Sequence, residues 1–420
     1  MKRRFNFLSV IVLIIFLLLI DLYVFLSVEI LAQAVSLDSV IKATYWIFSL
    51  TLLTLMVAIG YSALAVRKIT RIFTLVFNIF LAVFASKLVI VLVLLGEDAF
   101  RIILSFVQYL YRLKETNTSA FFVLHDRFLL VSELAFFLAV ACFSAFSFGV
   151  TRGKYHYKVH RKVLYFDELP ENFDGFTITQ ISDIHSGSFN RPQAVQRGVD
   201  LAKNQHSDLF VFTGDLVNHV ATEIEPFVEM FRQIRAPYGQ FSIVGNHDYG
   251  DYVSWKSREE KAENFRNLIK YHEKLGYRLL LDEHVKIEKN GQYITLLGVH
   301  NWGKGFGERG DLQKALRGVE SQSFKILLSH DPSHWDYQVK NNPLKIHLTL
   351  SGHTHGMQFG IEFLGFKWSP VKYRYHNWAG LTIENDRALY VNRGFGFHGF
   401  SGRIGIWPEV TVITLKRTRG

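Results

Sequence analysis

The chain has 420 residues, enough for two or three domains, and a formal net charge of +10. Its single cysteine, Cys142, excludes an intramolecular disulfide framework and a thiolate metal site. Residues 1–150 hold 12 Lys and Arg against 8 Asp and Glu, and the remainder holds 35 against 29. This even spread marks no nucleic-acid-binding stripe, so we expect no nucleic-acid partner and a general attraction to anionic membrane lipids.

Four apolar stretches in the first 150 residues are long enough to cross a bilayer, which takes about 20 residues. We expect them near 5–27, 44–66, 72–95 and 128–149. An Ala-Gln-Ala sequence at 32–34 would suit signal-peptide cleavage, but the first stretch is long for a signal sequence, so we expect an uncleaved helix. The segment 1–150 is therefore predicted to be an α-helical transmembrane bundle of four helices.

Basic residues indicate the orientation, because short cytoplasmic loops collect Lys and Arg. They cluster at 2–4, 67–71 and 152–162, whereas the first outer loop has only Lys42 and the loop 96–127 mixes both charges. We expect an integral protein of the inner or plasma membrane with four spans. Both termini and the second half of the chain are then in the cytoplasm.

Two features of this half allow more than one interpretation. Lys87 and Glu133 lie within apolar stretches and could form a functional pair. Alternatively, Lys87 packs against a polar neighbour and Glu133 lies near an interface. Residues 100–113 combine apolar and basic residues at helical spacing. They either lie flat on the membrane surface or form an ordinary connecting helix.

The second half has the composition of a soluble α/β domain at 176–420, preceded by a linker at 151–175 that is basic and then acidic. Asn290-Gly291 is a type I′ turn signal within a hairpin over 277–299. Other expected segments are helices at 191–205, 223–235, 257–275, 311–319 and 333–341, and strands near 386–392 and 408–416. This alternation predicts an α/β sandwich of two mixed sheets packed face to face, with helices outside.

Five short polar clusters each follow a run of β-type apolar residues. They are Asp183 and His185 in ISDIHSG, Asp215 in FTGDLVN, Asn246 and His247 in IVGNHDYG, His330 in LLSHDPSH, and His353 and His355 in LSGHTHGMQ. Carboxylates and imidazoles delivered rigidly at strand ends suit divalent transition metals. A site with two such metals most naturally hydrolyses esters of phosphorus.

The order of these clusters resembles that of the calcineurin-like metallophosphoesterase family, D-x-H, G-D, G-N-H-D/E, H and G-H-x-H, over residues 160–420. One local departure is Met357, where many relatives continue G-H-T-H with two glycines. The N-R-G-F-G and W-P-E-V-T-V segments resemble the membrane-attached, YkuE-like branch of the family. The resemblance implies a four-layer arrangement for the sandwich.

The resemblance also implies roles for the individual residues. One metal would be held by Asp183, His185, Asp215 and His355, and the other by Asp215, Asn246, His330 and His353, with Asp215 as the bridge. The two divalent ions would be Mn, Fe or Zn. His247 would be the catalytic histidine, which protonates the leaving oxygen or binds a phosphate oxygen. Asp248 would hold its ring in one tautomer.

The remaining polar residues have less support from motifs. We expect five histidines to be surface residues or to surround the site without binding metal: His219, His300, His334, His376 and His398. The aromatic segments 359–380 and 392–407 are either an apolar lip for acyl chains or the membrane, with Arg393 or Arg403 on a phosphate, or a packed loop region.

The sequence therefore predicts a membrane-anchored two-metal phosphoesterase that cleaves a phosphate ester or pyrophosphate bond. Tethering to a bilayer favours a lipid-linked substrate, such as a nucleotide-linked or phosphorylated glycolipid. The alternatives are a phosphodiesterase or phosphatase of soluble nucleotides, and a non-catalytic membrane scaffold that keeps the metal-bound fold.

Overall fold

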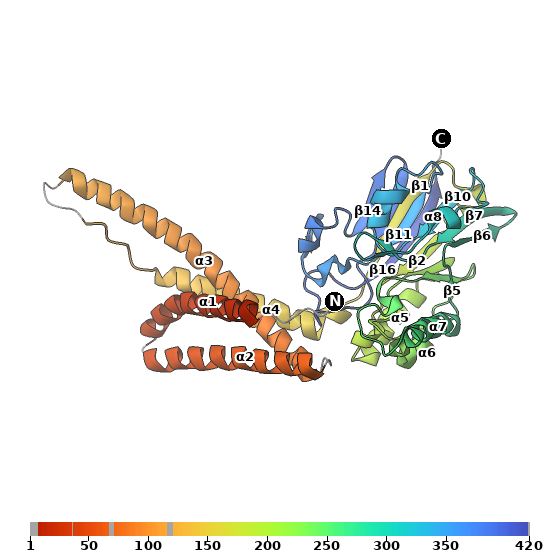
Figure 1. The fold of residues 1–420 in the computed structure, drawn as a ribbon. Helices are drawn as coiled ribbons and strands as arrows, with labels where there is room; N and C mark the ends of the chain where they lie inside the picture. Colours follow the sequence, from red (N-terminus) through yellow and green to blue (C-terminus); the bar gives the residue numbers. More distant parts are fainter. Residues whose placement is uncertain (1–6, 36, 67–70, 116–120, 419–420) are drawn as a thin grey trace. The chain divides into compact units, whose positions relative to one another are not determined.

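The computed structural model describes residues 7–35, 37–66, 71–115 and 121–418. Contacts divide the chain into a helical unit that ends at Phe148 and an α/β unit that begins at Gly149 (Figure 1).

The helical unit consists of four helices, each long and apolar enough to cross a membrane. They are α1 (Phe7–Ala34), α2 (Asp38–Val66), α3 (Arg71–Glu115) and α4 (Leu129–Thr151). The four predicted spans are confirmed, but α3 continues 20 residues beyond the predicted end at 95. Its 45 residues would extend about 67 Å at 1.5 Å per residue, twice the thickness of a bilayer core. The sequence 96–115 keeps helical spacing, so nothing ends the helix at the membrane boundary.

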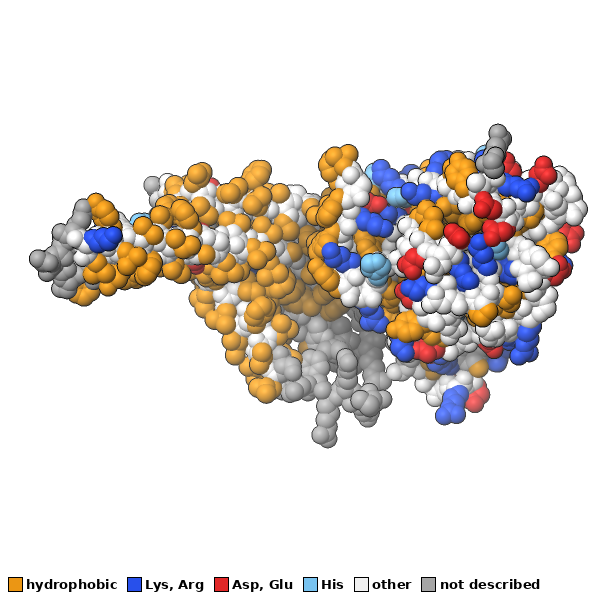
Figure 2. Space-filling view, turned by 90° about the horizontal axis from the view of Figure 1, so that it is seen from above, with side chains coloured by type: hydrophobic (Ala, Val, Ile, Leu, Met, Phe, Trp, Pro, Cys, Tyr) orange, Lys and Arg blue, Asp and Glu red, His pale blue; other side chains and the backbone are white. Residues whose placement is uncertain are grey.

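The polarity of the helical unit is opposite to that of a water-soluble bundle. Figure 2 shows its surface covered by apolar side chains. Ile47, Leu92 and Phe137 are each about two-thirds exposed. Polar side chains such as Asp21 and Ser49 are buried between the helices. Such a surface is stable only against hydrocarbon, which agrees with four membrane spans.

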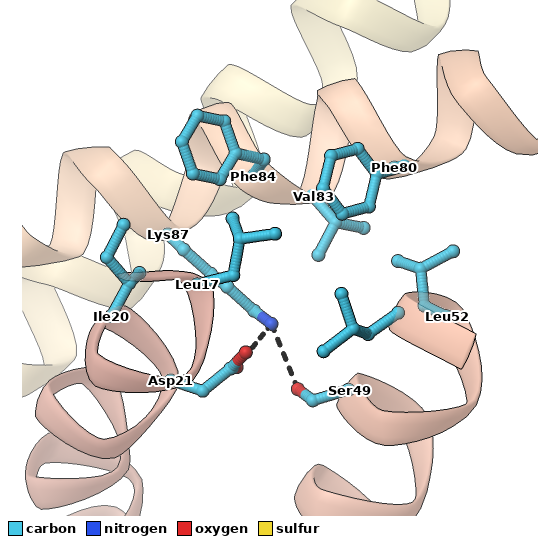
Figure 3. Close-up of a pocket in the computed structure, with 10 residues that line it drawn as sticks. Leu17, Ile20, Asp21, Ser49, Leu52, Phe80, Val83, Phe84 and Lys87 are labelled. Atoms are coloured by element: carbon cyan, nitrogen blue, oxygen red, sulfur yellow. Dashed lines mark hydrogen bonds and ion pairs between the residues drawn. The ribbon is translucent and has the colours of Figure 1, made fainter. Parts of the chain in front are cut away.

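An ion pair joins three of these helices (Figure 3). Lys87 on α3 reaches between α1 and α2, where its Nζ donates to Asp21 Oδ1 and, at 2.9 Å, to Ser49 Oγ. The Tyr45 hydroxyl donates to the same Asp21 oxygen at 2.7 Å. Lys87 therefore pairs with Asp21 rather than with Glu133, which is exposed. A cavity of about 20 Å³ beside the pair has room for about one water molecule.

We predict that Lys87→Met destabilises the helical unit by about 3 kcal/mol, because it leaves the Asp21 carboxylate buried without its counter-charge. The measurement is thermal unfolding of the full chain in detergent. The double variant Asp21→Asn with Lys87→Met should regain most of the loss. Additive losses in the double variant would contradict a coupled pair.

The α/β unit contains two six-stranded mixed sheets. The first has the order β1 (Lys158–Phe166), β16 (Glu409–Arg417), β2 (Thr177–Ile181), β3 (Leu209–Thr213), β4 (Gln240–Ile243) and β5 (Arg278–Leu279). The second has the order β14 (Gly380–Glu384), β15 (Arg387–Val391), β11 (Leu348–Ser351), β10 (Phe324–Leu328), β7 (Gln292–Gly298) and β6 (Glu283–Lys289). Two small hairpins complete the strands: β8 (Trp302–Gly303) with β9 (Gly307–Glu308), and β12 (Ile361–Phe363) with β13 (Phe366–Trp368).

Helices cover the outer faces of both sheets, which gives the predicted four-layer sandwich. The α-helices are α5 (Pro192–Lys203), α6 (Val228–Phe231), α7 (Arg258–Leu275) and α8 (Leu312–Ala315). The short helical turns are η1 (Gly153–Tyr155), η2 (Glu171–Phe173), η3 (Ser186–Ser188), η4 (Ala221–Phe227), η5 (His247–Tyr249), η6 (Trp335–Val339), η7 (His355–Gln358) and η8 (Pro370–Tyr373). Helices α5, α6 and α7 gather on the first sheet (Figure 1), and α8 and η6 pack on the second.

The main core lies between the sheets, where Ile178 and Val211 of the first sheet meet Ile326 and Leu350 of the second. These four side chains are fully buried, and burying each contributes about 1.5–3 kcal/mol. This packing fixes the position of one sheet against the other, and so the relative positions of their strand ends.

Two local predictions have different outcomes. The hairpin turn at Asn290-Gly291 is confirmed, with φ values of 49° and 80° between β6 and β7. The expectation of a linker at 151–175 is wrong, because this segment contains β1, which pairs in parallel with β16 over nine residues. Much of β1 is exposed, as suits a strand at the sheet edge, and this is why its composition resembles that of a linker.

Candidate metal centre

The polar clusters of the sequence lie at the carboxyl ends of strands from both sheets. Asp183 and Asp215 follow β2 and β3 in the first sheet, and His330 and His353 follow β10 and β11 in the second. Backbone hydrogen bonds tie these ends together. Asp183 N donates to Gly214 O at 2.9 Å, and Gly352 N donates to His330 O at 2.9 Å. The side chains are thus fixed by the sheets themselves.

Five of the seven expected metal ligands have left-handed backbone conformations, which residues other than glycine adopt at a cost of about 1–3 kcal/mol. They are Asp183, His185, Asp215, His353 and His355, with φ between 46° and 69°. Such strain persists only where the surroundings enforce it, and it gathers at functional sites. Met357 is also left-handed, with φ 53°, which gives a physical reason for the glycine of many relatives.

Two glycines let the strand ends approach the carboxylates. A Cβ at Gly245 would lie 2.2 Å from Asp215 Oδ1, and a Cβ at Gly352 would lie 2.3 Å from Asp183 Oδ2. No side chain fits at these distances. The glycines of the G-N-H and G-H-T-H motifs are therefore required by the packing of the two aspartates.

Around these aspartates the ligand atoms form two groups. In the first, His355 Nε2 lies 3.3 Å from Asp183 Oδ1, and His185 Nε2 lies 3.5 Å from Asp215 Oδ2. In the second, His330 Nε2 lies 3.2 Å from the same Asp215 Oδ2 and 3.3 Å from His353 Nδ1. Asp215 thus faces both groups, as a bridging carboxylate would.

Two buried polar atoms at this site have no hydrogen-bond partner among the described residues, Asn246 Oδ1 and His355 Nε2. The other end of the Asn246 amide is held, because its Nδ2 donates to Tyr252 Oη at 2.8 Å. An unpartnered buried acceptor such as Asn246 Oδ1 costs about 1–3 kcal/mol. Both atoms are ordinary metal ligands, so the residues fit divalent cations in the expected places.

Hydrogen bonds fix the tautomers of the histidines. His330 Nδ1 donates to Thr213 O at 2.7 Å, and His247 Nδ1 donates to Asn218 O at 2.8 Å, because a carbonyl can only accept. His185 Nδ1 lies 3.1 Å from Asn218 Oδ1. In the neutral rings the lone pair is then on Nε2, which can bind a metal or, in His247, hold the proton that the ring gives away.

His353 uses the opposite nitrogen. Its Nε2 lies 3.0 Å from Tyr375 Oη and 3.3 Å from Asp331 Oδ2, and Tyr375 in turn donates to Asp331 at 3.0 Å. This leaves Nδ1, the atom nearest His330, free to act as the ligand. Asp331 and Tyr375 therefore orient His353.

Asp248 does not contact the ring of His247, contrary to the expectation from the sequence. Its carboxylate accepts backbone N–H groups of Gly245, Asp215, Leu216 and Val217, whereas the His247 ring is held by Asn218. The expected contact of Asp248 with the ring is wrong, because the turn at η5 directs its side chain towards the end of β3. Burial and the nearby Asp215 raise the pKa of Asp248 to about 7, and its N–H donors oppose this.

The charges of the centre are strongly coupled. Burial would raise the pKa values of Asp183 and Asp215, but the surrounding histidines lower both, that of Asp215 well below its usual range. Burial lowers the pKa of His330, and the two carboxylates outweigh it and raise the pKa to about 10. Two ionised carboxylates in a buried site demand positive charge nearby.

A cavity of about 670 Å³ opens beside the centre. His185, Asp215, Asn246 and His247 form a polar part of its lining, and apolar and aromatic side chains form another: Phe306, Met357, Val371, Tyr373 and Phe400. Arg374 is the arginine among the described residues of this lining. The pocket therefore pairs the candidate metal centre with an apolar wall.

Residues outside the motifs also have defined places. His398 lines the pocket, with its ring centre 4.4 Å from that of His247, which agrees with the expectation that it surrounds the site. Arg393 and Arg403 do not reach the pocket. Arg393 is buried in ion pairs with Glu362 and Glu409, and Arg403 is buried against the backbone carbonyls of 394 and 396. Asn218, Asp331 and Tyr375 were missed because no motif marks them.

Comparison with known proteins agrees with this geometry. A family model described as "Probable Calcineurin-like phosphoesterase, transmembrane domain" matches residues 3–154, and the model "Calcineurin-like phosphoesterase" matches residues 176–357. The "Uncharacterized metallophosphoesterase YkuE" of Bacillus subtilis is 30% identical over 257 residues, 60% of this chain and 82% of YkuE. The chain belongs to the calcineurin-like metallophosphoesterase family. The predicted resemblance is confirmed.

Other metallophosphoesterases match over a similar length. The "Transmembrane protein with metallophosphoesterase domain" of Danio rerio is 29% identical over 260 residues, 60% of this chain and 55% of the zebrafish protein. An "Uncharacterized metallophosphoesterase" of Aquifex aeolicus is 26% identical over 267 residues, 62% of this chain and 93% of that protein. This chain thus spans about half the length of the zebrafish relative and most of the two bacterial ones.

We predict that Gly245→Ala lowers the metal content of the purified protein, because the added Cβ displaces the Asp215 carboxylate from the centre. Metal bound per chain is measured by mass spectrometry, with circular dichroism as the check on folding. Gly96→Ala is the matched control, since nothing is found within 4 Å of its Cβ position and its φ is not positive. Equal metal content in both variants would contradict the role assigned to Gly245.

Proposed function

We propose that this metallophosphoesterase is a phosphoric ester or pyrophosphate hydrolase that holds two divalent metal ions. The carrying observation is that Asp215 faces two histidine groups at once, 3.5 Å from His185 and 3.2 Å from His330. A carboxylate shared in this way is what a two-metal centre requires.

The proposed ligands follow the two groups. One ion is held by Asp183, His185, Asp215 and His355, and the other by Asp215, Asn246, His330 and His353. When bound, two such ions lower the pKa of water and neutralise charge on a phosphoryl group. The donor set of carboxylate, amide and imidazole suits Mn, Fe or Zn.

His247 is proposed as the catalytic residue that moves a proton. Its Nδ1 is fixed on Asn218 O, so Nε2 is the nitrogen that can give a proton to the leaving oxygen or contact a phosphate oxygen. Asn218 positions His185 and His247 together, and Glu223 positions Asn218 by accepting its backbone N–H at 2.6 Å. Asp248 supports the loop rather than the chemistry.

The substrate proposed is lipid-linked, such as a nucleotide-linked or phosphorylated glycolipid. Two observations support this choice. The pocket pairs its polar residues with an apolar wall that includes Phe306, Val371 and Phe400. The family model that matches residues 3–154 is that of a transmembrane domain, so the enzyme is tethered where such substrates are concentrated.

The reaction class is tested with the full chain in detergent, Mn²⁺ and bis-p-nitrophenyl phosphate. We predict metal-dependent turnover that chelation abolishes. His247→Ala should lower kcat about 100-fold or more and keep the metal content, because it removes a proton donor and no ligand. Asp215→Asn should lose both the turnover and the bound metal.

His376→Ala is the matched control for these variants, since His376 is an exposed histidine outside the catalytic pocket. It should retain full activity. Turnover without metal, or turnover that survives both His247→Ala and Asp215→Asn, would overturn the proposed function.

The substrate class is tested by comparing a nucleotide-linked glycolipid with the same nucleotide sugar lacking acyl chains. We predict the higher kcat/KM for the acylated substrate. Met357→Glu places a charge on the apolar wall and should lower that preference about tenfold. Ile383→Glu, at an exposed apolar position on β14, is the control. Equal rates on both substrates would instead favour soluble nucleotides.

The side of the membrane is a further part of the proposal. The basic clusters at 67–71 and 152–162 support a protein of the inner or plasma membrane whose α/β unit, called the catalytic unit from here on, lies in the cytoplasm. We predict that protease digests this unit in inside-out vesicles and spares it in sealed right-side-out vesicles. Digestion in the right-side-out vesicles would reverse the orientation.

A further inference from the structure

Large exposed apolar side chains cluster on and beside the β12–β13 hairpin. Phe363 is 69% exposed, Leu364 at the tip 89%, and Phe366 61%. From residue 149 onward, 13 large apolar side chains of the described part are exposed, and seven of them lie between 357 and 373. Clustering of this kind marks an interaction surface rather than scattered surface residues.

The register of the hairpin shows that its polarity is reversed. Ile361 pairs with Trp368 and Phe363 pairs with Phe366, so these four side chains share one face, whereas Glu362 pairs with Lys367 on the other. We call the first of these the apolar face and the second the polar face.

It is the polar face that packs on the protein. Glu362 makes a bidentate ion pair with buried Arg393, at 2.6 and 3.0 Å, and Lys367 Nζ donates to Ala379 O. The apolar face and the tip are left outward. A hairpin in water would bury the apolar face and expose the charges, so this arrangement fits hydrocarbon outside.

The base of the hairpin is joined by backbone hydrogen bonds to the segment at 403–404. Gly360 N donates to Ile404 O at 2.9 Å, and Ile404 N donates to Gln358 O at 2.8 Å. The neighbouring Arg403 N donates to the carbonyl oxygen of Gly149, the first residue of the same unit.

Charge near the hairpin suits an anionic surface. Lys372 and Arg374 are exposed on the segment that follows it, and the hairpin's acidic residue, Glu362, is neutralised by Arg393. Met357 and Tyr373, which belong to the same exposed cluster, also line the catalytic pocket. The apolar surface and the pocket entrance are therefore continuous.

We propose that the β12–β13 hairpin inserts its apolar face and tip into the interfacial layer of a bilayer that contains anionic lipids, beside the mouth of the catalytic pocket. Apolar side chains at the tip enter the acyl-chain boundary, and Lys372 and Arg374 lie at the headgroups. This contact does not depend on the proposed hydrolysis.

The test places a fluorophore at the tip of the hairpin in the full chain. Cys142→Ser removes the single cysteine, and Leu364→Cys then carries an environment-sensitive nitrobenzoxadiazole label. The matched control is Ile383→Cys, a 62% exposed apolar position on β14. Both proteins are reconstituted in phosphatidylcholine vesicles with and without phosphatidylglycerol. Quenching by spin-labelled lipids reads contact with the bilayer and involves no turnover.

The expected result is a blue-shifted label at 364 that spin-labelled lipids quench several-fold more than the label at 383, with stronger quenching when phosphatidylglycerol is present. Adding Phe366→Asp to the labelled protein should reduce the quenching at 364, since a buried charge on the apolar face opposes insertion. Equal weak quenching at both positions would overturn the proposal. Shielding of the label by a second copy, seen as cross-linking without lipid quenching, would also overturn it.

Discussion

Two carboxylates held away from water are the constraint on which the catalytic unit depends. Asp183 and Asp215 are 0% and 1% exposed, and a buried carboxylate is tolerated only with positive charge or strong donors beside it. Imidazoles from the strand ends of both sheets surround the two carboxylates. The glycines at 245 and 352, the left-handed backbone at five ligand positions and the fixed histidine tautomers all serve to keep this cluster compact.

The same constraint explains which residues surround the centre. Asn218, Asp331 and Tyr375 bind no metal in our assignment, yet each holds a ring nitrogen of a histidine in the required protonation state. Asp248 joins the loops after β3 and β4 through four backbone N–H groups. Hydrogen bonds from these surrounding residues thus offset the backbone strain at the ligands. Substitution of the surrounding residues should therefore weaken the site indirectly.

The polarity of each exposed surface indicates whether that surface faces lipid or water. The helical unit buries Asp21 and Ser49 and exposes apolar side chains, and the β12–β13 hairpin repeats that arrangement on the catalytic unit. The rest of the catalytic unit shows the mixed charged surface of a soluble protein (Figure 2). The membrane helices, the apolar hairpin and the apolar wall of the pocket share one property, an exposed apolar surface that is stable against apolar surroundings.

The sequence predicts the fold and the site where the signal is local. Apolar strands ending in polar motifs, the Asn290-Gly291 turn and the four apolar spans can each be read within a short window. Pairings between distant segments cannot. β1 is a strand because it pairs with β16, about 250 residues later, and its own composition is that of a linker. Asp248 lies next to His247 in sequence, yet one turn of backbone sends its carboxylate elsewhere. His398 and Tyr375 reach the site from loops without a motif.

The central claim is that Asp215 bridges two metal ions, and electron paramagnetic resonance of the Mn²⁺-loaded full chain tests it most directly. Two Mn²⁺ ions joined by one carboxylate give a spin-coupled multiline spectrum, because they lie about 3.5–4 Å apart in such centres. The account predicts this spectrum, with two ions per chain, and its loss in Asp215→Asn. A spectrum of isolated Mn²⁺ at one ion per chain would contradict the account.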